Sequence, residues 1–248
     1  MKSPIVLVHG AWHGGWCWAK VRPLLEAAGF KVFTPTLPGL GDRAHLIHPV
    51  PDLLTLVEDI AGLINAEELQ DVVLVGHSYA GMVVTGVADR LRERIRHLVY
   101  LDAAVPSDGD SFASHIPGIG EETVARRITA FKGMASDGVW LPPPSPSVVG
   151  VADPSDVAWL ERRLTPHPLQ TWLDPMPLPN AGHAGIEKTY VLATKPLTSV
   201  MGYPLHAEIA KQGGEWTLRE IECGHDMMVV EPEKTANLII EAAQTRKR

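Results

Sequence analysis

Short runs of β-branched and other apolar residues alternate with amphipathic stretches along most of the chain. The apolar runs predict six strands, at about 4–8, 30–34, 72–75, 95–101, 189–193 and 216–221. Apolar residues at three- and four-residue spacing predict the helices, at about 21–28, 51–64, 79–94, 205–212 and 231–244. Strands that alternate with helices are typical of an α/β fold, here a doubly wound, mostly parallel six-stranded sheet.

One long segment interrupts this alternation. Twelve of the 21 prolines lie between Pro106 and Pro179, and the helix-compatible stretches there, at about 121–131 and 156–164, are separated by proline-rich links. We expect residues 105–186 to form a mainly helical cap inserted into a core made of residues 1–104 and 187–248. The segment is too small for an independent core, so we expect one structural domain overall.

Composition narrows the function classes. The formal charge of −7 over 248 residues, without a long basic run, argues against nucleic acid or a membrane as partner. Two cysteines, Cys17 and Cys223, cannot form a disulfide framework, and the chain begins without a recognisable leader, so a cytoplasmic location is expected. The sequence leaves a homo-oligomer open.

The strongest chemical motif follows the third predicted strand. Gly76, Ser78 and Ala80 fit the nucleophile elbow G-x-S-x-G, with Ala80 in place of the second glycine. Small residues two positions before and after the serine are needed because the strand-turn-helix bend is tight. We predict that Ser78 is a nucleophile; the alternative is a serine that caps a helix.

A serine nucleophile needs a base, and eleven histidines are available. Only His225 lies in the loop after the last strand, where a doubly wound sheet returns the chain towards Ser78. His77 flanks the serine and is expected to hydrogen-bond locally. The pairs His9/His13 and His45/His48 lack a completing carboxylate or cysteine, so we expect no metal and no cofactor.

The loop after the first strand offers the remaining part of an acyl-transfer site. Two backbone N–H groups must face the developing oxyanion, one from the residue after the nucleophile and one from a neighbouring loop. These would belong to Tyr79 and Ala11, with Gly10 allowing the backbone to turn into the site.

Several motifs together resemble a known family. They are HGAWHGGWCW at 9–18, LLEAAG at 24–29, LPG at 37–39, GHS at 76–78, YLDA at 100–103 and GHD at 224–226. They resemble the α/β-hydrolases that group bacterial small-molecule esterases, pyrethroid and carbamate hydrolases, plant methylesterases and hydroxynitrile lyases. The resemblance covers roughly 1–104 and 187–245 and implies a serine hydrolase with a helical cap over an apolar pocket. The similar lyases carry a lysine after the histidine and a threonine in the oxyanion loop, where this chain has Asp226 and Ala11.

The third member of the triad does not occupy its usual place. In most of this fold the acid follows the penultimate strand, but here no carboxylate follows residues 189–193 until Glu208. Asp102, after the strand beside the nucleophile strand, is the best substitute. Glu208, Asp42, Asp226 or a Ser–His diad remain alternatives.

The expected substrate is a small hydrophobic or aromatic ester or carbamate, because the segment 105–186 is rich in large apolar residues. The residues expected to line its pocket are Trp12, Phe112, Trp140, Trp159 and Trp172. Two other classes stay open, a hydroxynitrile-lyase-like C–C lyase and a non-catalytic relative that binds small ligands.

Overall fold

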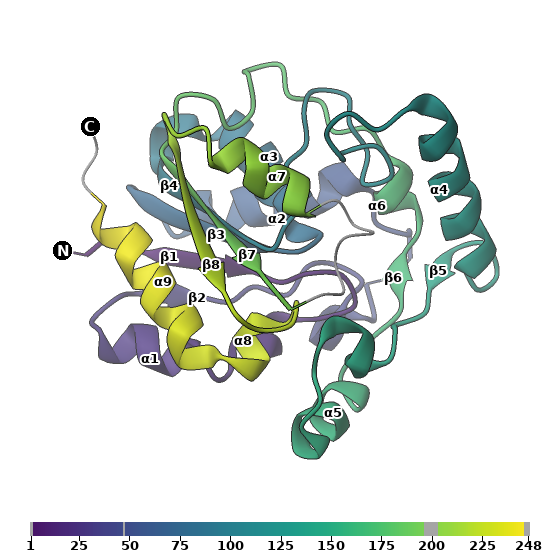
Figure 1. Cartoon of the computed structure of the whole chain (residues 1–248), viewed down its shortest axis with the longest axis horizontal. Coiled ribbons are helices and arrows are strands. Elements are labelled where there is room, and N and C mark those ends of the chain that lie inside the picture. Colours follow the sequence, from purple (N-terminus) through teal and green to yellow (C-terminus); the bar gives the residue numbers. More distant parts are fainter. Residues whose placement is uncertain (1, 47, 196–202, 246–248) are drawn as a thin grey trace.

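The central sheet consists of six parallel strands in the order β2-β1-β3-β4-β7-β8 (Figure 1). This computed structural model describes residues 2–46, 48–195 and 203–245. The strands are β1 (Ile5–Val8), β2 (Val32–Phe33), β3 (Val72–His77), β4 (Ile95–Leu101), β7 (Lys188–Ala193) and β8 (Trp216–Ile221). The predicted α/β fold and its six-stranded sheet are confirmed, and every pairing within the sheet is parallel.

Helices cover both faces of the sheet. The described chain outside 105–186 contains α1 (Arg22–Ala27), α2 (Leu53–Ala66), α3 (Ala80–Arg90), α7 (Tyr203–Ala210), α8 (Met227–Val230) and α9 (Pro232–Gln244), with 3-10 turns at Gly15–Trp18, Gly41–Arg43 and Arg92–Arg94. Buried residues of α2, α3 and α7 join one apolar cluster, and those of α1, α8 and α9 join a second. The two clusters take alternate residues of the central strands, such as Leu74 and Val75, because successive side chains of a strand point to opposite faces.

Two predicted elements are shorter than expected. The second strand was expected over 30–34 but covers only Val32–Phe33. The N–H of Phe30 donates to the Leu25 carbonyl at the end of α1, and Pro35 has no N–H to continue the pairing. The helix expected over 79–94 ends at Arg90, since Leu91 has φ −121° and ψ 36°, and a 3-10 turn follows.

The segment between β4 and β7, residues 105–186, is called the insertion below. It contains α4 (Glu121–Met134), α5 (Pro154–Glu161), α6 (Gln170–Leu173), a 3-10 turn at Pro146–Val149 and an antiparallel pair, β5 (Trp140–Leu141) with β6 (His167–Pro168), which the sequence pattern did not predict. In Figure 1, α4 and α6 lie at the right of the sheet, and α5 lies apart from them at the bottom. Phe112, Phe131 and Trp172 of the insertion share one cluster with the core residues Tyr79 and Met82. The insertion therefore packs continuously onto the sheet.

No helix in the described part of the chain is both long and apolar enough to cross a membrane.

Candidate active site

The carboxyl ends of the parallel strands bring the chemically interesting loops to one edge of the sheet. The loop at Gly10 follows β1, Ser78 follows β3, Asp102 follows β4 and His225 lies in the loop after β8. In open α/β sheets this edge is where ligands bind.

Ser78 sits on a strained turn between β3 and α3. Its φ of 58° lies in the left-handed region, which non-glycine residues adopt rarely. The Ser78 N–H donates to the Leu101 carbonyl (3.1 Å), and the Ala104 N–H donates to the Ser78 carbonyl (3.1 Å), so the segment after β4 clamps the turn. A Cβ on Gly81 would lie 1.8 Å from the Ala104 oxygen, so a larger residue at 81 would break this clamp.

His225 and Asp102 form a close buried pair. His225 Nδ1 lies 2.6 Å from Asp102 Oδ2, and the Asp102 side chain is fully buried. The other oxygen, Oδ1, accepts a hydrogen bond from the Ala193 N–H at 3.3 Å. Asp102 has φ 44°, and its own N–H donates to the Val191 carbonyl at 2.7 Å. Its carboxylate is thus fixed from both sides and faces one imidazole nitrogen.

The other candidate acids lie elsewhere. Glu208 is exposed on α7 and pairs with Lys211. Asp42 is exposed and accepts a hydrogen bond from the Thr36 hydroxyl. Asp226 is buried but pairs with His13 at 3.2 Å.

The Ser78 hydroxyl contacts a residue that the sequence did not single out. Ser78 Oγ lies 3.2 Å from the hydroxyl of Tyr203, at the start of α7. The Tyr203 ring stacks on His225, with centroids 5.4 Å apart and planes 8° from parallel. Among the described residues, no hydrogen bond joins Ser78 Oγ to His225. Tyr203 therefore touches both groups, and no motif or spacing marked it.

The loop after β1 comes close to the nucleophile. A Cβ on Gly10 would lie 2.9 Å from Ser78 Cβ and 2.9 Å from His77 Nδ1, so this approach requires glycine. Ala11 and Tyr79 are buried, and neither of their N–H groups donates a hydrogen bond to any residue that the structure describes. Both N–H groups are thus available to an oxyanion.

A buried polar network lies beneath the His225 loop. His77 Nε2 donates to the His225 carbonyl at 3.0 Å, and His13 donates from Nδ1 to the Ala11 carbonyl (2.8 Å) and from Nε2 to Asp226 (3.2 Å). Burial alone would lower the pKa of His13, but the charge of Asp226 and the hydrogen bond to it raise that pKa above its ordinary value. Burial alone would raise the pKa of Asp226, but the charge of His13 and the same hydrogen bond lower it. The pair links the first loop to the His225 loop, and both pKa shifts favour its ionised form.

Asp226→Asn is expected to destabilise the protein by about 3 kcal/mol at about pH 6, because it leaves a buried charged partner unpaired. Folding raises the pKa of His13, so its contribution to the free energy of unfolding is lost as the pH rises through its pKa in the folded protein. Folding lowers the pKa of Asp226, so its contribution is lost as the pH falls through its pKa in the folded protein. The difference in the free energy of unfolding between wild type and variant, measured by urea unfolding, should therefore shrink towards both extremes of pH. Asp71→Asn, at an exposed position, is the control, and equal stabilities of wild type and Asp226→Asn at every pH would contradict the ion pair.

The insertion and the His225 loop meet at two glycines. A Cβ on Gly224 would lie 2.6 Å from the Gly150 Cα, and one on Gly150 would lie 2.5 Å from the Gly224 Cα. Nearby, the Asp226 N–H donates to the Val149 carbonyl at 3.2 Å. The backbone of the insertion thus lies directly against the loop that carries His225.

The residues expected to line a substrate pocket separate into groups. Phe112 and Trp172 are buried and pack on each other with ring centroids 4.6 Å apart, and Trp12 packs on Trp172 at 5.4 Å. The Trp172 ring also stacks on Tyr79 at 6.2 Å, so this group adjoins the residue that follows the nucleophile. Trp140 is half-buried on β5 and belongs to neither cluster.

The expectation for Trp159 needs correction. Its ring packs on Trp16 with centroids 5.0 Å apart, and the guanidinium of Arg163 lies over it. Trp159 thus packs against the other apolar cluster, apart from Phe112 and Trp172. Apolar character alone does not encode which cluster a side chain joins.

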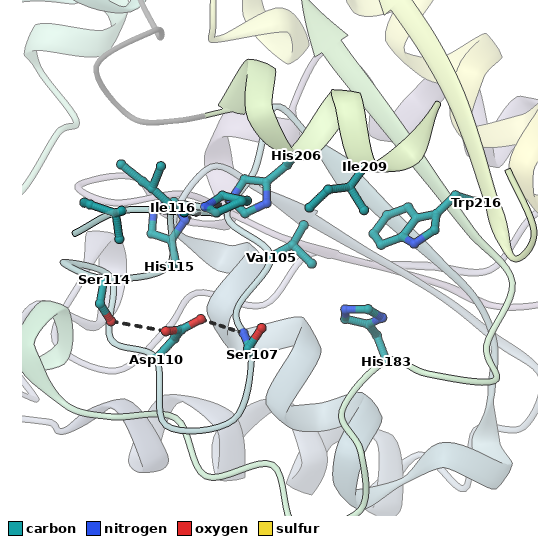
Figure 2. Close-up of a pocket in the computed structure, with 13 residues that line it drawn as sticks. Val105, Ser107, Asp110, Ser114, His115, Ile116, His183, His206, Ile209 and Trp216 are labelled. Carbon is teal, nitrogen blue, oxygen red and sulfur yellow. Dashed lines mark hydrogen bonds between the residues drawn. The ribbon is translucent and has the colours of Figure 1, made fainter. Parts of the chain in front are cut away.

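A cavity of about 450 Å³ is lined by residues from the insertion, from α7 and from the start of β8 (Figure 2). Its lining consists of Val105, Ser107, Asp110, Ser114, His115, Ile116, Pro117, Gly118, Ile119, His183, His206, Ile209 and Trp216. Neither Ser78 nor His225 lines it, and none of the five residues expected at the substrate pocket does. Burial lowers the pKa of His183 and of His206 to about 4 and that of His115 well below its ordinary value, so all three imidazoles are neutral at neutral pH. The half-buried carboxylate of Asp110 also belongs to the lining.

Several residues considered for metal binding or thiol chemistry are already engaged. His9 donates from Nδ1 to the Gly10 carbonyl and accepts at Nε2 from the Leu37 N–H. The described residues contain one close set of possible metal ligands, His77, His225 and Asp226, all buried. Burial raises the pKa of the Cys17 thiol, and it raises that of Cys223 to about 12, so both thiols stay protonated at neutral pH.

Comparisons with known proteins agree on one family. A model described as "Alpha/beta hydrolase family" matches residues 5–238. The carbendazim hydrolyzing esterase of Nocardioides sp. (strain SG-4G) is 44% identical over 235 residues, which cover 93% of this chain and 96% of that protein. Methylesterase 1 of Arabidopsis thaliana is 36% identical over 125 residues, 47% of this chain and 48% of that protein.

A solved structure agrees in fold. An extracellular alpha/beta-hydrolase from a Paenibacillus species superimposes with a TM-score of 0.78 at 22% identity, covering 98% of this chain and 100% of the other. The strained serine turn, the parallel sheet and the family match over most of the length lead to one conclusion: this chain belongs to the alpha/beta hydrolase family.

Proposed function

We propose that this protein is a serine hydrolase that cleaves an ester or carbamate bond of a small hydrophobic molecule through an acyl- or carbamoyl-enzyme on Ser78. The observation that carries the proposal is the 2.6 Å contact between Asp102 and His225, next to a serine held at φ 58°. Together these are the three groups that an activated serine needs.

In the proposed mechanism, Asp102 keeps the proton of His225 on Nδ1, so that Nε2 can accept the proton of Ser78. Ser78 Oγ then attacks the substrate carbonyl, and the N–H groups of Ala11 and Tyr79 stabilise the oxyanion. His225 returns the proton to the leaving group. Water then attacks the acyl-enzyme, with His225 again acting as base.

The substrate class is proposed from the polarity of the side chains around the site. The rings of Phe112 and Trp172 pack on Tyr79, the residue after the nucleophile, which favours a hydrophobic molecule at the site. The relative named for hydrolysing carbendazim supports hydrolysis of a small molecule. The same machinery attacks the carbonyl of an ester or of a carbamate, so both belong to the proposal.

Covalent labelling tests the nucleophile. After exposure to a fluorophosphonate, mass spectrometry of the digested protein should find one adduct, on Ser78, because only an activated serine reacts quickly. The Ser147→Ala variant, at an exposed serine, should label like wild type. A folded protein that stays unmodified at Ser78 would refute the proposed function. A panel of aryl esters, methyl esters and carbamates would then define the preferred bond.

A further inference from the structure

Tyr203 occupies an unusual position in the candidate active site. Its side chain is fully buried, and its hydroxyl lies 3.2 Å from Ser78 Oγ, the atom that would form the new bond to the substrate. Its ring lies almost parallel to the imidazole of His225. The contact therefore places a phenol hydroxyl directly beside the reacting atoms.

Surrounding groups hold Tyr203 in this place. The Tyr190 hydroxyl lies 2.9 Å from the Ala103 carbonyl and 3.2 Å from the Tyr203 carbonyl, so its one proton is shared between the segment after β4 and the start of α7. The ring of His115 lies 6.3 Å from the Tyr203 ring at 22° to its plane. His115 also lines the cavity of about 450 Å³, so Tyr203 packs against a residue of that cavity on one side and against His225 on the other.

The side of the site on which Tyr203 lies indicates its role. The oxyanion faces Ala11 and Tyr79, whereas the leaving group must lie where His225 can return a proton to it. Because the Tyr203 ring stacks on His225 and its hydroxyl lies 3.2 Å from Ser78 Oγ, the hydroxyl is within reach of a leaving group that is held between Ser78 and His225. A hydroxyl there can stabilise the negative charge that develops on the departing oxygen.

We propose that Tyr203 is a catalytic hydrogen-bond donor to the leaving-group oxygen, an inference that rests on the proposed function. As the Ser78 Oγ–carbon bond forms, the serine proton moves to His225 Nε2. As the bond from carbon to the leaving oxygen breaks, that proton moves from His225 to the leaving oxygen. Tyr203 keeps its own proton throughout and only turns its O–H from Ser78 Oγ to the leaving oxygen.

The environment of the phenol fits a donor. Burial raises the pKa of Tyr203 above its ordinary value, and the charge of Asp102 acts in the same direction. The hydroxyl therefore keeps its proton at every pH at which the protein would work.

A leaving-group series tests the inference. The substrates are p-nitrophenyl, phenyl and ethyl esters of butyric acid, which share one acyl group and differ in the pKa of the departing alcohol. For Tyr203→Phe we expect kcat/KM to fall by about 30- to 100-fold with the ethyl ester and by less than about threefold with the p-nitrophenyl ester. A good leaving group needs little stabilisation, so the loss of kcat/KM should grow with the pKa of the departing alcohol.

Tyr100→Phe is the matched control. Tyr100 is also fully buried and also loses a hydroxyl hydrogen bond, to Thr85 at 2.8 Å, so a merely structural effect should lower all three rates equally. A uniform loss, or no loss, across the series for Tyr203→Phe would overturn the inference. Fluorophosphonate labelling of wild type separates the two proposals: if Ser78 labels and the series is flat, only the role of Tyr203 fails. If Ser78 does not label, both proposals fail.

Discussion

Ser78→Ala is expected to lower kcat/KM towards aryl esters by about 10⁵-fold or more, the largest effect of any single substitution in this chain. The variant removes the atom that forms the covalent bond. Only the oxyanion donors and substrate binding remain, and these give a small rate above that of water.

The fold should tolerate this change. Alanine keeps the small size that the turn requires, and the backbone hydrogen bonds of residue 78 to Leu101 and Ala104 do not use the side chain. Steady-state kinetics on the panel, with circular dichroism to verify folding, measure the effect. Adding His225→Ala should lower the rate little further, because the two groups act as one unit. A folded Ser78→Ala protein with substantial activity would require a different nucleophile.

Asp102→Asn is expected to lower kcat/KM by about 10⁴-fold while leaving the fold intact. The Ala193 N–H needs an acceptor, which turns the amide oxygen of an asparagine towards Ala193. The amide nitrogen then faces His225 Nδ1, and because it is a donor, it forces the proton of the imidazole onto Nε2. An imidazole with its proton on Nε2 cannot accept the proton of Ser78.

Measuring the stability of Asp102→Asn controls for a loss of activity through unfolding. Asparagine adopts positive φ values readily, so the φ of 44° at residue 102 is compatible with it. Urea unfolding should give a midpoint close to that of wild type. Glu208→Gln, at an exposed position on α7, should leave activity unchanged. If Asp102→Asn keeps full activity and Glu208→Gln does not, Glu208 is the acid.

The sequence predicted most of the fold because the signals are local. Buried parallel strands are continuous apolar runs, and the runs at 72–75 and 95–101 match β3 and β4 closely. The ends of these strands also predicted where Ser78 and Asp102 would lie, since parallel strands end at one edge. The lack of a carboxylate after β7 was enough to direct attention to Asp102.

The remaining parts of the site depend on contacts that no local pattern encodes. Tyr203 reaches Ser78 across 125 positions of the sequence, from a helix whose apolar pattern only predicts burial. His13 and Asp226 are separated by 213 positions, and each looks unremarkable without the other. Trp159 was expected at the pocket because it is large and apolar, but its contact with Trp16 was not predictable from spacing.

The close approach of Gly150 and Gly224 has a consequence for exchanging parts between relatives. A chimaera that takes residues 105–186 from another member of the family would have to keep a glycine with positive φ at position 150, where φ is 83°. Any other residue there would push the backbone of Gly224 and, through it, His225. Grafting a new insertion onto this scaffold therefore constrains the loop that carries His225 as well.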